Sequence, residues 1–314
     1  MASALARSHE VTLFTRGLSD AGAFPNVVHV RGDRTDAQSV AQLRERAFDA
    51  VVDTSGYVPA EVRLVRETLS QRPHYVFVSS VSVYVDYTKP ADETSPVAAP
   101  TLDAMLATER YAGLKVACEQ EVRAGGEDRA CVVRPGRILG PHDSDPRAPW
   151  LLRRVAEGGR VLAAGAPGAP VQFIDARDVG DFLVTCAEER ACGTFNAVAP
   201  PFAASELYAV IRDVTGSNAE FAWVSDEVLL AHAVKPYSEG PFWLPRAYAN
   251  ASRVDASRAV ARGLRVRPPR ETLRDEWAWM QSGWDSAAGV RAQRKLDILA
   301  GLSREREEKL LALS

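Results

Sequence analysis

Short apolar runs alternate with helix-forming stretches between Glu10 and Gly136, and this alternation restricts the possible folds more than any other feature of the chain. The runs are rich in Val, Phe and Leu and are bounded by turn residues, which is typical of buried parallel strands. The expected strands cover residues 10–15, 27–33, 49–53, 74–80 and 130–136. Strands and helices in this order predict an α/β fold with a doubly wound parallel sheet.

Tyr111 and Lys115 lie four residues apart in a stretch of helix-forming residues, so we expect both side chains on one helical face. An ammonium beside a phenol favours the anionic form, which predicts a lowered pKa for Tyr111. Such a tyrosine can exchange a proton with a substrate oxygen. Ser80 or Ser82, at the end of the preceding strand, can hydrogen-bond the same oxygen. An exposed Tyr and a solvated Lys on a helix surface can have the same spacing by chance, so the neighbouring motifs must decide whether the pair is catalytic.

The context is the order of the motifs along the chain. A strand that ends in Ser79-Ser80-Val-Ser82-Val-Tyr84 precedes Tyr111, and a strand that ends in Arg-Pro-Gly follows Lys115. In this order the chain resembles the extended short-chain dehydrogenase/reductase family of NAD(P)-dependent epimerases, dehydratases and reductases. The resemblance implies a Rossmann-like sheet and catalytic roles for Ser80, Tyr111 and Lys115, and it places Ser82 and Tyr84 beside the substrate.

The resemblance also implies where a dinucleotide would bind. Arg16 follows the strand at 10–15, where an arginine suits the 2′-phosphate of NADP and an acid suits NAD, so NADP is slightly favoured over NAD; a plain surface arginine is the alternative. Asp33 occupies a position that the family often places against the adenine. Small residues after the strand at 49–53 let the backbone approach a pyrophosphate–ribose unit. The remaining expected cofactor contacts are Thr54, Ser55, Gly56, Lys115 and Pro135.

Two domains of unequal size are expected. Residues 1–140 would form the dinucleotide-binding domain. Residues 141–314 would form a smaller substrate-binding region and a C-terminal tail, and this region would return to the first domain near 170–200. His142 follows the family's Pro-Gly-x-x-x-Gly-Pro segment and is either a substrate acid or a plain loop histidine. The aromatic segment 236–248 is either a wall of the substrate pocket or core packing.

One part of the family pattern is not found. Members ordinarily begin with a strand, a glycine-rich turn and a helix that receives the pyrophosphate, whereas residues 1–9 here resemble the end of that helix. Without the first strand, the strands near Val11 and Val51 lack their shared neighbour. Three explanations are open: a wrongly assigned start codon, a shortened protein with a differently closed sheet and weak cofactor binding, or a strand supplied by another segment or subunit.

Composition excludes several classes of function. The net charge of −3 gives no electrostatic reason to expect nucleic acid or an acidic membrane as a partner. No apolar run approaches the length of a membrane span and no signal-peptide pattern is present, so a cytoplasmic protein is expected. The four cysteines have no metal-binding spacing, and no metal site is expected. The expected partner is a small molecule, and a homodimer is the habit of the family.

Three functions compete. The first is an NAD(P)-dependent oxidoreductase or epimerase/dehydratase that acts on a sugar nucleotide or a small secondary metabolite through Ser80, Tyr111 and Lys115. The second keeps these residues for acid/base chemistry without a cofactor, as in a dehydratase, cyclase or isomerase. The third is a non-catalytic nucleic-acid-binding or regulatory relative.

Overall fold

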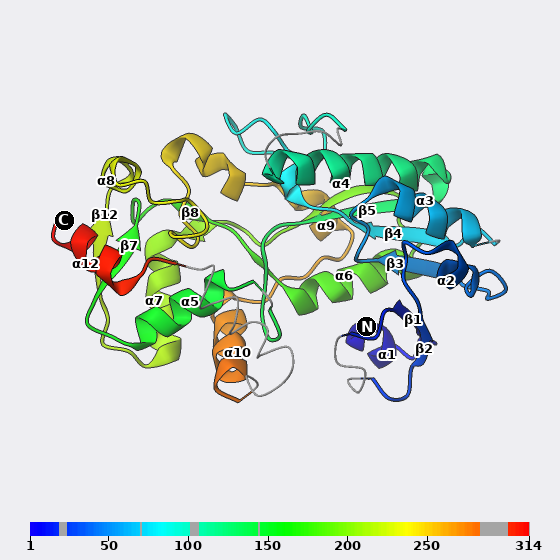
Figure 1. Cartoon of the computed structure of the whole chain (residues 1–314), viewed down its shortest axis with the longest axis horizontal. Coiled ribbons are helices and arrows are strands. Elements are labelled where there is room, and N and C mark those ends of the chain that lie inside the picture. The colour runs from blue at the N-terminus through cyan, green and yellow to red at the C-terminus, as the bar shows by residue number, and fades with distance from the viewer. Residues whose placement is uncertain (19–23, 70, 101–106, 144, 283–300, 314) are drawn as a thin grey trace.

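Four parallel strands in the order β10-β5-β4-β3 form the main sheet (Figure 1). The computed structural model describes the chain except residues 19–23, 70, 101–106, 144, 283–300 and 314. The strands of the main sheet are β3 Ala50–Asp53, β4 His74–Val78, β5 Ala130–Pro135 and β10 Gly193–Ala197. The helices beside them are α3 Pro59–Thr68, α4 Ala107–Ala124, α6 Ala176–Glu188 and α9 Ser257–Ala261. The predicted α/β fold with a parallel sheet is therefore confirmed.

Both faces of this sheet are covered by helices. Successive side chains of a strand point to opposite faces. Tyr75 and Phe77 of β4 accordingly pack with residues of α3 and α4, while Val76 between them packs with residues of α6. In Figure 1, α3 and α4 lie above the sheet and α6 lies below it. The apolar run 74–78 is thus buried on both faces, as expected for a central parallel strand.

The two N-terminal strands form a separate parallel pair, β1 Thr12–Thr15 with β2 Val28–Arg31. Within the described part of the chain, β1 pairs only with β2 and β3 pairs only with β4, as expected for strands that lack a shared neighbour. Side chains hold this pair against the main lobe. The helix α1 Ala2–Ala6 packs on α6, and Arg34 beyond β2 donates to both carboxylate oxygens of Asp53 at 2.8 and 2.9 Å. The helix α2 Ala37–Ala41 follows, capped by Asp36.

The remaining strands form three small pairs between and beyond these elements. β6 Ile138–Leu139 pairs with β9 Ile174–Asp175, β8 Pro170–Val171 pairs with β11 Phe202–Ala203, and β7 Arg160–Ala164 pairs with β12 Glu220–Val224. The segment 170–175 therefore contains two short strands, β8 and β9, which pair with different partners.

Helices complete the smaller lobe at the C-terminal end of the molecule (Figure 1). They are α5 Arg147–Ala156, α7 Ala204–Thr215, α8 Asp226–Ala231, α10 Pro269–Ser282 and α12 Arg304–Leu311. Elsewhere along the chain, short 3₁₀ turns lie at Val81–Val83, Glu127–Arg129 and Arg246–Ser252. The core of this lobe packs α5, α7 and α10 around Phe173 and Leu207. None of the helices in the described ranges is long and apolar enough to cross a membrane.

Candidate active site

A cavity of about 1090 Å³ opens at the carboxyl ends of β3, β4 and β5. Ligands of open α/β sheets bind at this edge of the sheet. Residues of the segment 236–254 form the opposite part of its lining. The predicted site residues that line it are Thr54, Ser80, Ser82, Tyr84, Tyr111, Lys115 and Pro135.

Ser80 and Tyr111 meet within this cavity. Ser80 follows β4, and its Oγ accepts a hydrogen bond from the Ser82 N–H at 3.1 Å. The Ser80 hydroxyl lies near enough to the phenol of Tyr111, on α4, to lower the pKa of that phenol in part. Tyr111 is 36% exposed, so its phenol is open to a ligand. The structure thus brings together a serine hydroxyl and a tyrosine hydroxyl at one point of the cavity wall.

The expected lowering of the Tyr111 pKa is wrong. Burial raises the pKa of Tyr111 above its ordinary value, and the nearby Ser80 hydroxyl offsets only part of that rise. The physical reason is the direction of Lys115, whose ammonium points into the protein instead of toward the phenol. In the free protein, Tyr111 is therefore protonated at neutral pH and presents an O–H donor.

Lys115 is held by backbone carbonyls. It is 2% exposed, and its Nζ donates to the oxygen of Gly56 at 2.9 Å and to the oxygen of Val78 at 2.7 Å. The ammonium also lies 4.3 Å from the ring centroid of Phe77 and 5.3 Å from that of Tyr57. Burial lowers the pKa of Lys115 to about 8. An ammonium has three N–H groups, so one is left to meet a ligand hydroxyl.

The lowered pKa of Lys115 predicts a pH-dependent stability. Between the folded pKa near 8 and the unfolded value of 10.5, the folded state binds fewer protons, so its stability rises with pH. Relative to a Lys115→Met variant, the wild-type free energy of unfolding should rise by about 2 kcal/mol between pH 7.5 and pH 9.5. Urea denaturation of both proteins at the two pH values measures this difference. Parallel pH curves for the two proteins would show that Lys115 has an ordinary pKa.

Gly56 is required for this arrangement. A Cβ at this position would lie 2.6 Å from Cε2 of Phe77 and 2.8 Å from Cγ2 of Val62, both inside the core. Its neighbours Thr54 and Ser55 are exposed; Thr54 lines the cavity, and Ser55 Oγ accepts a hydrogen bond from Arg34. Of the turn after β3, Thr54 and Tyr57 line the cavity, while Gly56 is buried behind it and gives its carbonyl to Lys115.

Arg16 and Asp33 lie apart from the cavity lining, at the carboxyl ends of β1 and β2. Arg16 is exposed. Hydrogen bonds from Thr35 lower the pKa of Asp33, and the charge of Arg16 lowers it further, so the two predicted cofactor residues lie close to each other. A guanidinium and a carboxylate thus both stand at this edge of the β1–β2 pair, where the guanidinium suits NADP and the carboxylate suits NAD.

Two predicted substrate residues need correction. The ring of Tyr84 lines the cavity, but its hydroxyl donates to Asn196 Oδ1 at 2.7 Å and accepts from Arg134 at 3.0 Å, so it is occupied inside the protein. The side chain of His142 lies outside the cavity lining, is exposed, and stacks on Trp279 with 5.3 Å between ring centroids. The alternative, a plain loop histidine, describes His142.

Several residues of the cavity were not predicted from the sequence. Tyr57 follows Gly56 directly, and its ring centroid lies 6.5 Å from that of Tyr111. Tyr57 could have been predicted from the sequence, because it ends the same turn after β3 that contains Gly56. Other lining residues had no such signal, since the fold alone brings them to the cavity: Tyr87, Arg137, Asp145 and Arg147. Of the aromatic segment 236–248, Tyr237, Phe242 and Tyr248 line the cavity, while Trp243 packs in the core.

Comparison with known proteins defines the class. Residues 1–197 match the NAD dependent epimerase/dehydratase family. The chain belongs to this family, and the resemblance to extended short-chain dehydrogenases/reductases is confirmed.

Individual relatives are more distant. The chain is 29% identical over 203 residues to a protein named chloroplast stem-loop binding protein of 41 kDa b from Arabidopsis thaliana, and this match covers 58% of the chain and 50% of the relative. The match thus spans about half the length of that curated relative.

Solved structures share the fold. UDP-glucose 4-epimerase of Thermus thermophilus, in complex with NAD, superposes with a TM-score of 0.65 at 18% identity and covers 90% of this chain and 94% of its own. A protein named RMD from Pseudomonas aeruginosa, in complex with NADPH, superposes with a TM-score of 0.57 at 17% identity and covers 85% and 99% of the two chains.

Proposed function

We propose that this chain is an NAD(P)-dependent oxidoreductase or epimerase/dehydratase that acts on a sugar nucleotide or a small secondary metabolite. The observation that carries the proposal is that Ser80, Tyr111 and Lys115 line one cavity at the carboxyl edge of a parallel sheet. Family membership and neighbours named as sugar-nucleotide enzymes support it. The volume of about 1090 Å³ exceeds that of most single-ligand pockets, so a nicotinamide and a substrate fit together.

The residues present fit the nicotinamide end of the cofactor. Lys115 would hold the ribose through its remaining N–H, and the close backbone at Gly56 would lie against the same group. The bound nicotinamide would supply a hydride acceptor or donor. Every proton movement then falls to this chain: the neutral phenol of Tyr111 donates its proton to a carbonyl oxygen that is being reduced, and in the opposite direction the phenolate of Tyr111 receives the proton of a hydroxyl. Ser80 orients that oxygen.

Calorimetric titration with NADP⁺ and NAD⁺ tests the proposal. We expect both to bind, NADP⁺ more tightly, because the guanidinium of Arg16 is available for a 2′-phosphate. An Arg16→Gln variant should lose the preference and keep binding NAD⁺. Incubation with UDP- and dTDP-sugars should then show oxidation or reduction of the bound nicotinamide by absorbance. If neither dinucleotide binds to the folded protein, the redox proposal fails and cofactor-free acid/base chemistry takes its place.

Nucleic-acid binding is a second candidate function, favoured by the name of the plant relative. The net charge of −3 argues against it, since binding to phosphate backbones depends on neutralising cations. Titration with an RNA stem-loop at two salt concentrations distinguishes the candidates. Affinity that falls steeply with salt would support this second function.

A further inference from the structure

The guanidinium of Arg137 lies in the wall of the cavity and forms no ion pair with any carboxylate in the described part of the chain. Arg137 follows the Pro-Gly pair at the end of β5. Its guanidinium lies between two rings, 4.5 Å from the centroid of Tyr237 and 4.4 Å from that of Phe242. Nη1 and Nη2 are shielded from solvent and have no hydrogen-bond acceptor among the described residues. A hydrogen-bond donor that is shielded from water and has no acceptor destabilises the folded state, and a shielded charge without a partner destabilises it more.

The acidic residues near Arg137 do not supply that partner. Asp145 is bound by Arg147, whose Nε lies 2.7 and 2.9 Å from its two oxygens. Burial raises the pKa of Asp143 to about 7, so this carboxyl is half protonated at neutral pH, and its Oδ2 makes no hydrogen bond within the described ranges. Arg147 therefore neutralises Asp145, while Arg137 has no carboxylate hydrogen-bonded to it among the described residues; Arg137, Asp145 and Arg147 line the cavity.

Backbone strain is located at the same point. Tyr237 and Phe242 both have φ of 63°, in the left-handed region that aromatic residues rarely adopt. Neighbouring contacts hold the segment in this conformation: Trp243 Nε1 donates to Asp226 Oδ1 at 2.8 Å, and Tyr237 N donates to the oxygen of Trp243 at 3.4 Å. Strained residues of this kind cluster at ligand sites. Here the two strained residues are the two whose rings enclose the guanidinium.

We propose that Arg137 binds a compact oxyanion, a carboxylate or a phosphate, that the substrate carries. The proposal rests on the function proposed above and requires that the substrate, whether a sugar nucleotide or another metabolite, places an anionic group at Arg137. The rings of Tyr237 and Phe242 pack against the guanidinium, and its paired N–H groups match two oxygens of an anion. Because both terminal nitrogens are shielded in the free protein, the segment 236–242 shifts as the anion enters. Tyrosines around the rest of the cavity contact the body of the substrate: Tyr57, Tyr87, Tyr111 and Tyr248.

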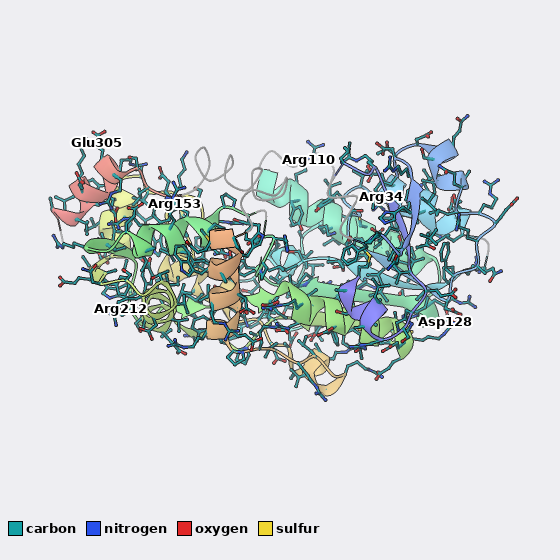
Figure 2. All side chains as sticks on the ribbon, turned by 90° about the horizontal axis from the view of Figure 1, so that it is seen from below. Arg34, Arg110, Asp128, Arg153, Arg212 and Glu305 are labelled. Carbon is teal, nitrogen blue, oxygen red and sulfur yellow. The ribbon has the colours of Figure 1, made fainter. Side chains whose placement is uncertain are left out.

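Three aromatic probes test this site in the whole chain without nicotinamide: benzoate, phenyl phosphate and the neutral benzamide. Calorimetry should show tighter binding of one or both anions than of benzamide, and the stronger anion identifies the group. In Arg137→Leu the anion Kd should rise about tenfold to a hundredfold, as expected for hydrogen bonds to a charged group. Arg137→Lys should keep part of the affinity. The control is Arg212→Leu. Arg212 also packs on a ring, that of Phe221, but it is exposed on α7 of the smaller lobe, away from the cavity lining (Figure 2).

Thermal unfolding without ligand separates binding from a structural role. Removing an unpaired shielded charge should leave the midpoint of Arg137→Leu equal to or above that of the wild type, whereas a structural role would lower it. Equal binding of benzamide and both anions by the wild type, or anion binding unchanged in Arg137→Leu, would overturn the inference. Titration of the same wild-type preparation with NAD(P)⁺ is independent of this result. Wild-type protein that binds a dinucleotide but neither anion would reject only the inference about Arg137. Wild-type protein that binds an anion but no dinucleotide would reject only the proposed redox function.

Discussion

Replacing Tyr111 with phenylalanine should lower turnover by about 10²- to 10⁴-fold, the range that a positioned general acid contributes. The variant loses the only atom that the proposed chemistry needs from this side chain. Its ring remains on α4 beside Tyr57, so the packing of the cavity wall is kept. Because no carbonyl or charged group of the protein depends on the phenol in the described structure, the fold should be unaffected. Dinucleotide affinity should stay within a few-fold of the wild type, so the loss appears in kcat.

Tyr208→Phe is the matched control, since it also removes one phenolic hydroxyl. Tyr208 lies in the core of the smaller lobe, where burial raises the pKa of its phenol to about 12. Its turnover should equal that of the wild type. The measurement is steady-state turnover of the sugar nucleotide found active in the incubation assay, together with calorimetric titration of NAD(P)⁺. Retained turnover in Tyr111→Phe would remove Tyr111 from the mechanism, whatever the reaction proves to be.

Local patterns predicted the main sheet because its strands are buried on both faces and read as continuous apolar runs. The run at 74–78 is such a case, and so is the run at 130–135. The strand β7 at Arg160–Ala164 was not predicted, since it is short and contains small residues that suit a helix equally well. The run at 170–175 reads as one strand, but its two ends pair with different partners, β11 and β6. Pairing of this kind depends on the tertiary fold, which spacing along the chain does not encode.

The candidate site was predictable where one element carries two residues. Tyr111 and Lys115 share a helix, and both line the cavity. The direction of each side chain was not predictable. The spacing predicted the Lys115 ammonium beside the Tyr111 phenol. Instead, the ammonium donates to the carbonyls of Gly56 and Val78, which come from two other elements. Arg137 illustrates the same limit, because its cationic character in the cavity depends on rings about a hundred residues further along the chain.

Replacing Arg134 with methionine should destabilise the protein by about 3–5 kcal/mol, as expected when one partner of a buried ion pair is removed. Arg134 of β5 is 4% exposed and Glu119 of α4 is 1% exposed. The pair has two hydrogen bonds, at 2.9 Å and 2.7 Å, and Ser79 Oγ donates to the same carboxylate at 2.6 Å. The loss would leave the Glu119 carboxylate buried without its strongest partner. Urea denaturation measures the change in the free energy of unfolding.

The pair also connects stability to the site. Glu119 lies one helical turn beyond Lys115, and Ser79 precedes Ser80, so the network fixes α4 against β4 where the candidate residues stand. Arg63→Met is the control: it removes the exposed arginine of a surface pair with Glu121 and should leave the unfolding midpoint unchanged. The double variant Arg134→Met with Glu119→Leu should recover much of the stability, because no fully buried charge is then left unpaired; Arg123, which also pairs with Glu119 at 3.5 Å, is partly exposed. It should nevertheless turn over more slowly than the wild type, since α4 has lost its polar attachment to the sheet. An Arg134→Met protein as stable as the wild type would show that the network contributes nothing to the fold.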